Sequence, residues 1–270
     1  MAGQKRAKDV ARAKQERQAS RRIEQQRARR RNAIIAVGVV VAIAGIVLFA
    51  LLRPDSEPAA QPGSAGAKPS PPVAAPAGIS CTDAEPGEAT GTYSKPEAVG
   101  LKPGSAMTLD TNCGPVTFSL DVTQAPKSTN ALAFLAEQGW YNNGNCQRLV
   151  VNGIYVVQCG AGAPDGTGDP GFTVPDENLP KPAAGGPTGY ARGTVAMANR
   201  GPNTSSSQFF VVYKDSFLAP DYTIVGQVTS GLEVIEYVAA QGVSSESSNL
   251  NDGPPAQPLV IKTATVRNGP

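Results

Sequence analysis

Residues 197–210, MANRGPNTSSSQFF, are the stretch on which the fold of this chain depends. A polar, turn-rich run at 199–207 leads directly into Gln208, Phe209 and Phe210. Gly, Pro, Asn and Ser favour turns, whereas the aromatic and β-branched residues that follow favour a strand. Because side chains alternate between the two faces of a strand, Phe209 is predicted to point into a core and Gln208 and Phe210 to share the outer face. Three interpretations remain for the stretch: a binding surface, a catalytic surface, or only a strand that enters a core.

Short segments typical of strands lie on both sides of this stretch. Residues 107–110 and 116–120 alternate around an Asn112-Cys113-Gly114 turn and predict a hairpin. A second hairpin is predicted around Asn152-Gly153, a dipeptide suited to a tight type I′ turn. The further predicted strands are 147–151, 154–158, 194–197, 209–213, 224–228 and 259–266.

Two helices are predicted between these strands. Residues 127–141 carry an apolar face, with Ser128 or Thr129 as the N-cap and Gly139 as the stop signal. Residues 232–240 form a second, shorter helix between glycines. Many short strands with only two helices predict a mainly β domain, a closed antiparallel barrel with helical caps.

Charge is divided unevenly along the chain. Residues 1–31 hold 12 of the 24 Lys and Arg but only 3 of the 22 Asp and Glu, which leaves 12 basic and 19 acidic residues for the remainder. Two regions with different roles therefore share the chain. The chain contains no histidine, which excludes Ser-His and Cys-His catalysis and every His-metal site.

The N-terminal part predicts a membrane anchor. Residues 33–52 are 20 uncharged residues, which as a helix would span about 30 Å, the thickness of a hydrocarbon core. The basic run before them favours a cytoplasmic N-terminus and an extracytoplasmic C-terminal part. A cleaved signal peptide is the alternative, although the apolar run is long for one and lacks a small-x-small cleavage pattern.

A Pro-, Ala- and Gly-rich stretch follows the predicted anchor, and its composition is typical of a disordered tether. We therefore expect a single-pass membrane protein whose globular domain is exported. The expected regions are a basic arm at 1–31, a transmembrane anchor at 32–53, a linker at 54–80 and a globular domain with a short N-terminal extension at 81–270.

All four cysteines lie on the side predicted to be exported, where oxidation is possible. None occurs in a CxxC spacing, and without histidine a metal site is not expected. Four cysteines allow three pairings. We favour Cys146–Cys159, which brackets a predicted hairpin, and Cys81–Cys113, which would pin the N-terminal extension to the domain.

Residues 160–171, GAGAPDGTGDPG, form a Gly-rich loop after a predicted strand. Such a loop can bind phosphate, but no GK[ST] ending and no helix signal follow it. We expect a long surface loop.

Five segments of the chain resemble the cyclophilin family. Residues 197–210 resemble the family signature, in which MAN is followed by a Gly-Pro-Asn-Thr loop and then by SQFF. The other four resemble the first-helix entry, the FHR…FMxQGG segment, the Gly-rich loop with its DEN motif, and the FGxVxxGxxVV segment; they are residues 125–135, 146–160, 166–179 and 222–236. The resemblance covers about residues 102–268 and looks most like actinobacterial exported cyclophilins. It implies a closed eight-stranded antiparallel barrel capped by two helices, with a peptide groove on its outer face and peptidyl-prolyl cis-trans isomerase activity.

The implied reaction is rotation about an X–Pro peptide bond, with a barrier of about 18–20 kcal/mol. No bond breaks, so no covalent intermediate and no cofactor are expected. A fixed cationic donor aimed at the prolyl nitrogen would bind the twisted amide better than the planar one. The resemblance assigns this role to Arg148 and makes Gln158 the residue that orients it. It also implies that the backbone of Asn199 binds the residue before proline, beside Ala198, and that Gln208 lines the groove.

The resemblance also places an apolar pocket for the proline ring, on Tyr155, Val156, Phe210 and Leu218. The chain departs from the family at several of the implied positions, namely Gln147, Tyr155, Val156, Phe217 and Tyr222. Phe217 stands where many members carry Trp, and Tyr222 where many carry His. Because Phe217 lacks an indole N–H, we expect cyclosporin to bind more weakly while isomerisation is retained.

We therefore expect a membrane-tethered prolyl isomerase that acts on proline-containing exported polypeptides and assists their folding. The alternative is a non-catalytic adaptor that binds proline-containing segments at the cell envelope. A nucleic-acid role for residues 1–31 finds no support in the acidic remainder of the chain.

Overall fold

The computed structural model describes residues 79–181 and 188–270. The predicted basic arm, the transmembrane anchor and nearly all of the predicted linker lie outside the described residues. Within the described ranges, no helix is both long and apolar enough to cross a membrane.

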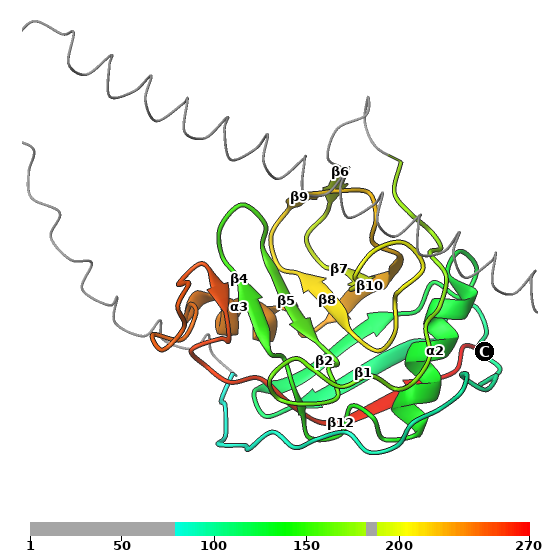
Figure 1. Ribbon diagram of the computed structural model, residues 1–270, viewed down its shortest axis with the longest axis horizontal. Helices are drawn as coiled ribbons and strands as arrows, with labels where there is room; N and C mark the ends of the chain where they lie inside the picture. Colours follow the sequence, from blue (N-terminus) through cyan, green and yellow to red (C-terminus); the bar gives the residue numbers. More distant parts are fainter. Residues whose placement is uncertain (1–78, 182–187) are drawn as a thin grey trace, which may run out of the picture. The chain divides into compact units, whose positions relative to one another are not determined.

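The described residues form a mainly β domain with two helices (Figure 1). The helices are α2 (Pro126–Glu137) and α3 (Leu232–Ala240). The strands are β1 (Ala106–Thr111), β2 (Gly114–Ser119), β3 (Gly144–Asn145), β4 (Arg148–Val150), β5 (Val156–Cys159), β6 (Thr188–Tyr190), β7 (Thr194–Met197), β8 (Phe209–Val212), β9 (Ser216–Leu218), β10 (Ile224–Ser230), β11 (Asp252–Gly253) and β12 (Val260–Arg267).

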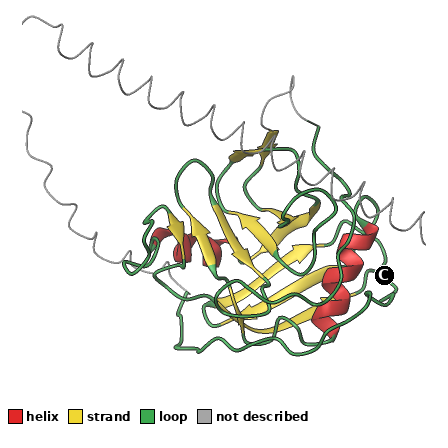
Figure 2. Ribbon diagram, in the orientation of Figure 1, coloured by secondary structure: helices red, strands yellow, loops and turns green. Residues whose placement is uncertain are grey.

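Most of the strands form one curled antiparallel sheet with a helix on either side of it (Figure 2). Ten strands pair in the order β11-β4-β5-β8-β7-β10-β2-β1-β12-β3, and β6 pairs separately with β9. Strand β3 pairs with β12 and β4 pairs with β5, while only Cys146 and Gln147 separate β3 from β4 along the chain. The segment 144–150 therefore connects the two ends of the curled sheet.

This sheet differs from the eight regular strands that were expected. Four short strands, β3, β6, β9 and β11, were not predicted, because two or three residues are too few to show an alternating pattern. The predicted tight turn at Asn152-Gly153 is also wrong. Val150 pairs with Val156, so residues 151–155 form a longer loop whose positive-φ residue is Gly153.

The core contains the residues that alternation assigned to the inner faces of the strands. Met107 and Leu109 of β1 are buried, and Phe209 is fully buried. The Phe209 ring lies 5.9 Å from the ring of Phe118 and 5.8 Å from that of Tyr141, centroid to centroid. The prediction that Phe209 belongs to the core is confirmed.

Helix α2 begins differently from the prediction. Pro126 occupies its first turn, and Ser128 and Thr129 lie inside the helix rather than at its N-cap. The free backbone N–H groups of Lys127 and Ser128 donate instead to the carboxylate of Glu177, at 3.0 and 2.9 Å. A carboxylate from a loop 49 residues away thus replaces the local cap, and its charge suits the positive end of the helix dipole.

Both predicted disulfides are confirmed, Cys81–Cys113 and Cys146–Cys159. The first ties the N-terminal extension to the β1–β2 turn, and the second joins the segment before β4 to the end of β5.

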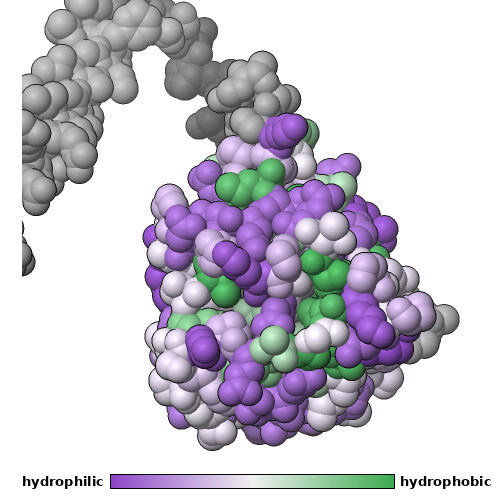
Figure 3. Space-filling view, turned by 90° about the vertical axis from the view of Figure 1, so that its right-hand side faces the viewer, coloured by the Kyte–Doolittle hydropathy of each residue, from purple (hydrophilic) through white to green (hydrophobic). Residues whose placement is uncertain are grey.

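Hydrophobic residues appear on the face seen in Figure 3 as separate patches among hydrophilic ones. Among the described residues, the exposed large hydrophobic side chains are those of Leu179, Phe217 and Leu250. Burial of the remaining large apolar side chains is what stabilises the fold.

Candidate functional site

Pairing between neighbouring strands brings three of the predicted site residues into one row. Arg148 of β4 is opposite Gln158 of β5, and Gln158 is opposite Phe210 of β8. Directly opposed residues of antiparallel strands share a face of the sheet. The three side chains therefore lie side by side on the outer face, although 62 residues separate the ends of the row in sequence.

The guanidinium of Arg148 is held by a two-point ion pair. Its Nε donates to Oδ1 of Asp252 at 2.6 Å, and its Nη2 donates to Oδ2 at 2.7 Å. Asp252 is on β11, opposite Val150 and so diagonal to Arg148 on the same face. Donation of these hydrogen bonds to Asp252 raises the pKa of Arg148, and the same contact lowers the pKa of Asp252. Both side chains stay charged near neutral pH.

The opposite edge of the guanidinium points toward Gln158. Nη1 of Arg148 donates to Oε1 of Gln158 at 3.2 Å. A guanidinium has five N–H donors, and the contacts within the described residues use three of them. The Arg148 side chain is 42% exposed, so two N–H groups remain for a bound molecule.

A chain of amide groups continues from Gln158 across the face. Nε2 of Gln158 donates to Oε1 of Gln208 at 2.7 Å, and Nε2 of Gln208 donates to the carbonyl oxygen of Gly166 at 3.1 Å. Gln147 adds a second donor to Oε1 of Gln208 at 3.0 Å. Because arginine can only donate and a backbone carbonyl can only accept, the two ends fix the orientation of both amides between them.

A pocket of about 160 Å³ with both polar and apolar lining residues opens beside this polar row. The Phe210 ring packs edge-on against Tyr222, with their centroids 5.4 Å apart. Leu218 and Val156 are buried in the same small cluster. The pocket is lined by Arg148, Ile154, Val156, Gln158, Ala198, Asn199, Phe210, Leu218 and Tyr222. A pocket that combines apolar side chains with a fixed cation suits a small ring next to a polar bond.

A second pocket of about 190 Å³ adjoins the first and shares Gln158, Ala198 and Asn199 with it. Its other lining residues are more polar and include Gly166, Gly168, Asp169, Arg200, Thr204, Ser206, Ser207 and Gln208. The Gly-rich loop 160–171 thus forms one wall of this pocket. It is a surface loop, as expected.

Asn199 lies between the two pockets and its side chain is fixed on both sides. Its Nδ2 donates to the carbonyl oxygen of Asp221 at 2.8 Å, and its Oδ1 accepts from the N–H of Gly201 at 3.2 Å. Ala198 donates its N–H to the carbonyl oxygen of Gln208 at 2.9 Å. These contacts hold the segment that begins with Asn199 beside β8.

Two residues predicted to contact the substrate, Tyr155 and Phe217, do not line the pocket. Tyr155 faces away from the pocket: its ring packs edge-on against Tyr213, 5.9 Å between centroids, with Nζ of Lys214 4.4 Å from its centroid. Ile154 and Val156, on either side of Tyr155 in the chain, line the pocket instead. Phe217 does not line the pocket either and is 69% exposed, while its neighbour Leu218 points inward.

Sequence reasoning missed three residues that build the site. Ile154 lines the pocket in place of Tyr155. Tyr190 lies beneath it and accepts a hydrogen bond at 3.2 Å from the N–H of Tyr222, and burial raises the pKa of Tyr190 to about 12. Asp252 lies in a turn-rich segment 104 residues from Arg148. The available sequence signal was alternation along the predicted strand 154–158, which puts Ile154 on the same face as Val156 and Gln158 and Tyr155 on the other.

The fold and this geometry agree with comparisons to known proteins. Residues 106–266 match the family model described as cyclophilin type peptidyl-prolyl cis-trans isomerase. A probable peptidyl-prolyl cis-trans isomerase B of Mycobacterium leprae is 36% identical over 198 residues, which cover 69% of this chain and 66% of that protein. Its namesake from Mycobacterium tuberculosis is 38% identical over 164 residues, covering 58% of this chain and 52% of that protein. The chain thus matches about half to two thirds of the length of these relatives.

Solved structures give the same result. A cyclophilin type peptidyl-prolyl cis-trans isomerase of Cryptosporidium parvum is 26% identical, with a TM-score of 0.50, over 62% of this chain and 99% of that one. A second structure of that protein, determined in the presence of the dipeptide ala-pro, matches at the same identity and TM-score. Since the family match extends over more than half of its residues, this chain belongs to the cyclophilin-type peptidyl-prolyl cis-trans isomerase family.

Proposed function

We propose that the described domain catalyses cis–trans isomerisation of X–Pro peptide bonds. The observation that carries this proposal is the placement of Arg148, which is held along one edge by Asp252 and lines a pocket together with Val156, Phe210 and Leu218. A proline ring in that pocket would be clamped, while the guanidinium donates to the prolyl nitrogen as the amide twists. That nitrogen has a free lone pair only in the twisted state, so the donor lowers the barrier rather than merely tightening binding.

The protein does not have to break a bond or transfer a proton in this mechanism. Arg148 supplies charge, and Gln158 fixes the position of its Nη1. Phe210 and Tyr222 exclude water from the ring, which strengthens the interaction between the guanidinium and the prolyl nitrogen. We expect the backbone of Asn199 to bind the residue that precedes proline, and the place of Asn199 in the lining of both pockets supports this.

The test is a protease-coupled isomerisation assay on the purified full chain. Arg148→Ala is expected to lose about 100-fold or more in kcat/KM, as is typical when a group that stabilises transition-state charge is removed. Arg192→Ala is the matched control, because Arg192 also pairs with a carboxylate, Glu236, but does not line either pocket. Equal activity in the two variants would remove Arg148 from the mechanism.

One observation favours a second function, a non-catalytic adaptor for proline-containing segments. Asp252 compensates the charge of Arg148 before any peptide binds, which weakens the donor compared with a free guanidinium. Peptide binding without acceleration of isomerisation in the same assay would support the adaptor.

We further propose that residues 32–53 anchor the chain in a membrane, with the domain on the extracytoplasmic side and exported polypeptides as its substrates. The uncharged segment, the basic residues before it and two disulfides support this. We also propose that the curled sheet is a closed barrel of eight principal strands, with segment 144–150 joining its two ends. Membrane fractionation of the full chain, followed by protease treatment of intact cells, tests the anchor: a domain that stays soluble or protected contradicts it.

A further inference from the structure

The extension before the family-matched region packs along the domain as an extended segment. We call residues 79–101 the strap; the family match begins only at 106. Four of its backbone N–H groups donate to backbone carbonyl oxygens of the domain body. The disulfide between Cys81 and Cys113 holds its start, and Val99 near its end donates to Oδ1 of Asn130 on α2 at 2.9 Å.

The strap holds both ends of the Gly-rich loop 160–171. The N–H of Ala89 donates to the carbonyl oxygen of Gly162 at 2.7 Å, and that of Tyr93 donates to the carbonyl oxygen of Pro170 at 2.6 Å. At Gly171 the approach is so close that a Cβ atom would lie 2.7 Å from the carbonyl oxygen of Tyr93. The loop and the strap are therefore fitted to each other.

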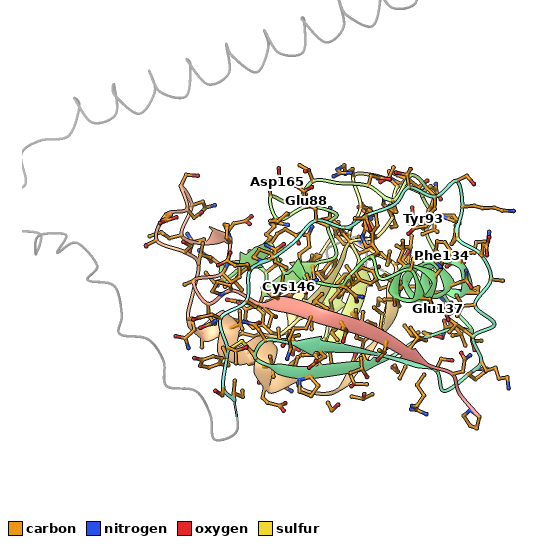
Figure 4. All side chains as sticks on the ribbon, turned by 90° about the horizontal axis from the view of Figure 1, so that it is seen from below. Glu88, Tyr93, Phe134, Glu137, Cys146 and Asp165 are labelled. Carbon is orange, nitrogen blue, oxygen red and sulfur yellow. A yellow bond between two sulfur atoms is a disulfide. The ribbon has the colours of Figure 1, made fainter. Side chains whose placement is uncertain are left out.

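Tyr93 fixes the middle of the strap. Its ring meets Phe134 of α2 edge-on with centroids 5.1 Å apart, and Phe134 meets Phe172, just beyond the loop, at 6.3 Å. Figure 4 shows Tyr93 beside Phe134, and on the same side of the domain the strap residue Glu88 near the loop residue Asp165. Edge-on aromatic pairs of this kind add to the burial energy of the rings.

The part of the loop between these two fixed ends faces the substrate side. Gly166, Gly168 and Asp169 line the second pocket, and the carbonyl oxygen of Gly166 ends the amide chain that begins at Arg148. The Gly-rich loop therefore contacts the strap with its two ends and lines the second pocket with the residues between them.

We propose that the strap is a positioning element for substrate binding: it sets the shape of the second pocket and so the affinity for substrate residues that precede the X–Pro bond. The second pocket adjoins the proline pocket on the side of Asn199. At about 3.3 Å per residue, an extended peptide bound through Asn199 brings residues upstream of proline to this wall. The proposal rests on the proposed function for the direction in which the peptide lies.

The test compares Tyr93→Ala with wild type in the full chain, using two peptides. The shorter peptide has the residue before proline as its N-terminal residue, and the longer one has three further residues upstream of it. Isomerisation is measured by NMR exchange, which needs no protease and so permits any peptide length. For the longer peptide we expect Tyr93→Ala to lower kcat/KM about three- to tenfold, mainly through a higher KM. Without the Tyr93 ring, the Gly-rich loop has to be ordered when the peptide binds. The shorter peptide is expected to lose less than about twofold, since it does not reach the wall.

Tyr237→Ala is the matched control. Tyr237 on α3 is likewise partly buried against the core, but it does not line either pocket. It should leave the ratio between the two peptides at the wild-type value. If Tyr93→Ala and Tyr237→Ala change that ratio equally, or neither changes it, the strap has only a structural role and the proposal is wrong.

The same experiment separates this proposal from the proposed function. If wild type accelerates neither peptide, the isomerase assignment fails. Calorimetric affinities then decide the strap alone: weaker binding of only the longer peptide by Tyr93→Ala supports it, and unchanged binding overturns it.

Discussion

Arg148 depends on Asp252 more than on any neighbour in its own strand. A two-point contact between a guanidinium and a carboxylate fixes both the position and the plane of the guanidinium. Because the two side chains are about 42% and 34% exposed, the pair contributes at most about 1 kcal/mol to stability once solvent screening is considered. Its main effect is therefore on geometry: Asp252 is a positioning residue that acts through Arg148.

We expect Asp252→Asn to lower kcat roughly tenfold with a smaller change in KM, since a misplaced catalytic group costs turnover. The amide would present an N–H to a group that can only donate, so the two-point contact cannot re-form. Asp110→Asn is the control. Asp110 also forms an ion pair, with Oδ2 3.6 Å from Nζ of Lys262, but it lines neither pocket. Full activity in Asp252→Asn with the fold intact would refute this role.

The pH dependence of activity should also reflect this pair. Hydrogen bonding from Arg148 lowers the pKa of Asp252, so the contribution of Asp252 to stability is complete above its unfolded value of about 3.9 and is lost as pH falls through the lowered value. The chain has no histidine, and the pKa of Arg148 is raised. We therefore expect kcat/KM to be flat from about pH 5.5 to 8 and to decline only below about pH 4. A pH–rate profile with a step near pH 6.5 would contradict it.

At the scale of elements, the loop at 175–178 joins parts of the fold that are distant in sequence. Asp176 and Asn203 exchange hydrogen bonds between backbone N–H and side-chain oxygen, at 3.1 and 3.0 Å. Glu177 binds the start of α2, and Asn178 donates to the carbonyl oxygen of Ile224 on β10 at 2.8 Å. The PDEN motif at 175–178 therefore has a structural role: it holds the loop at 199–207 next to α2 and β10.

Removal of the carboxylate from Glu177 should destabilise the fold. We expect Glu177→Gln to lower the free energy of unfolding by about 0.5–2 kcal/mol, the usual value of a helix cap with a favourable dipole interaction. Glu137→Gln serves as the control on the same helix, because Glu137 lies at the negative end of the dipole and its loss should be neutral or slightly stabilising. Urea denaturation followed by circular dichroism measures both, and equal losses would disprove the capping role.

At the scale of the whole domain, the two disulfides close loops that differ in length. Cys81 and Cys113 are 32 residues apart, and the other pair is 13 apart. Cross-linking restricts the unfolded chain, and the restriction grows slowly with the length of the loop. The longer loop contains the strap, so its disulfide also keeps the strap next to the body of the domain.

We expect the double variant Cys81→Ser, Cys113→Ser to lose about 3–4 kcal/mol of unfolding free energy by the chain-entropy estimate. Urea midpoints of the oxidised variant and of oxidised wild type give the comparison. A loss below about 0.5 kcal/mol would mean that the strap's noncovalent contacts already hold it, and that the disulfide adds little.

Much of the secondary structure could be predicted from the sequence, because alternating strands and helical faces are local patterns. The strand at Thr194–Met197 and the helix at Leu232–Ala240 have the predicted bounds. Of the three possible pairings of the cysteines, the one that the predicted hairpin and the N-terminal extension favoured is confirmed. In residues 197–210, alternation along the strand also predicted the side-chain positions: Phe209 lies in the core and Phe210 lines the pocket.

The contacts that shape the site required the tertiary structure. Asp252 reaches Arg148 only because β11 pairs with β4, and Glu177 reaches α2 only because a loop folds back over it. Family resemblance placed Tyr155 in the pocket, but Tyr155 lies in the loop before β5, packs against Tyr213 and leaves its place to Ile154. Sequence by itself determined which residues are candidates for the proposed isomerisation. The structure decided which of them meet, because hydrogen bonds and strand pairing between distant segments have no local signature in the chain.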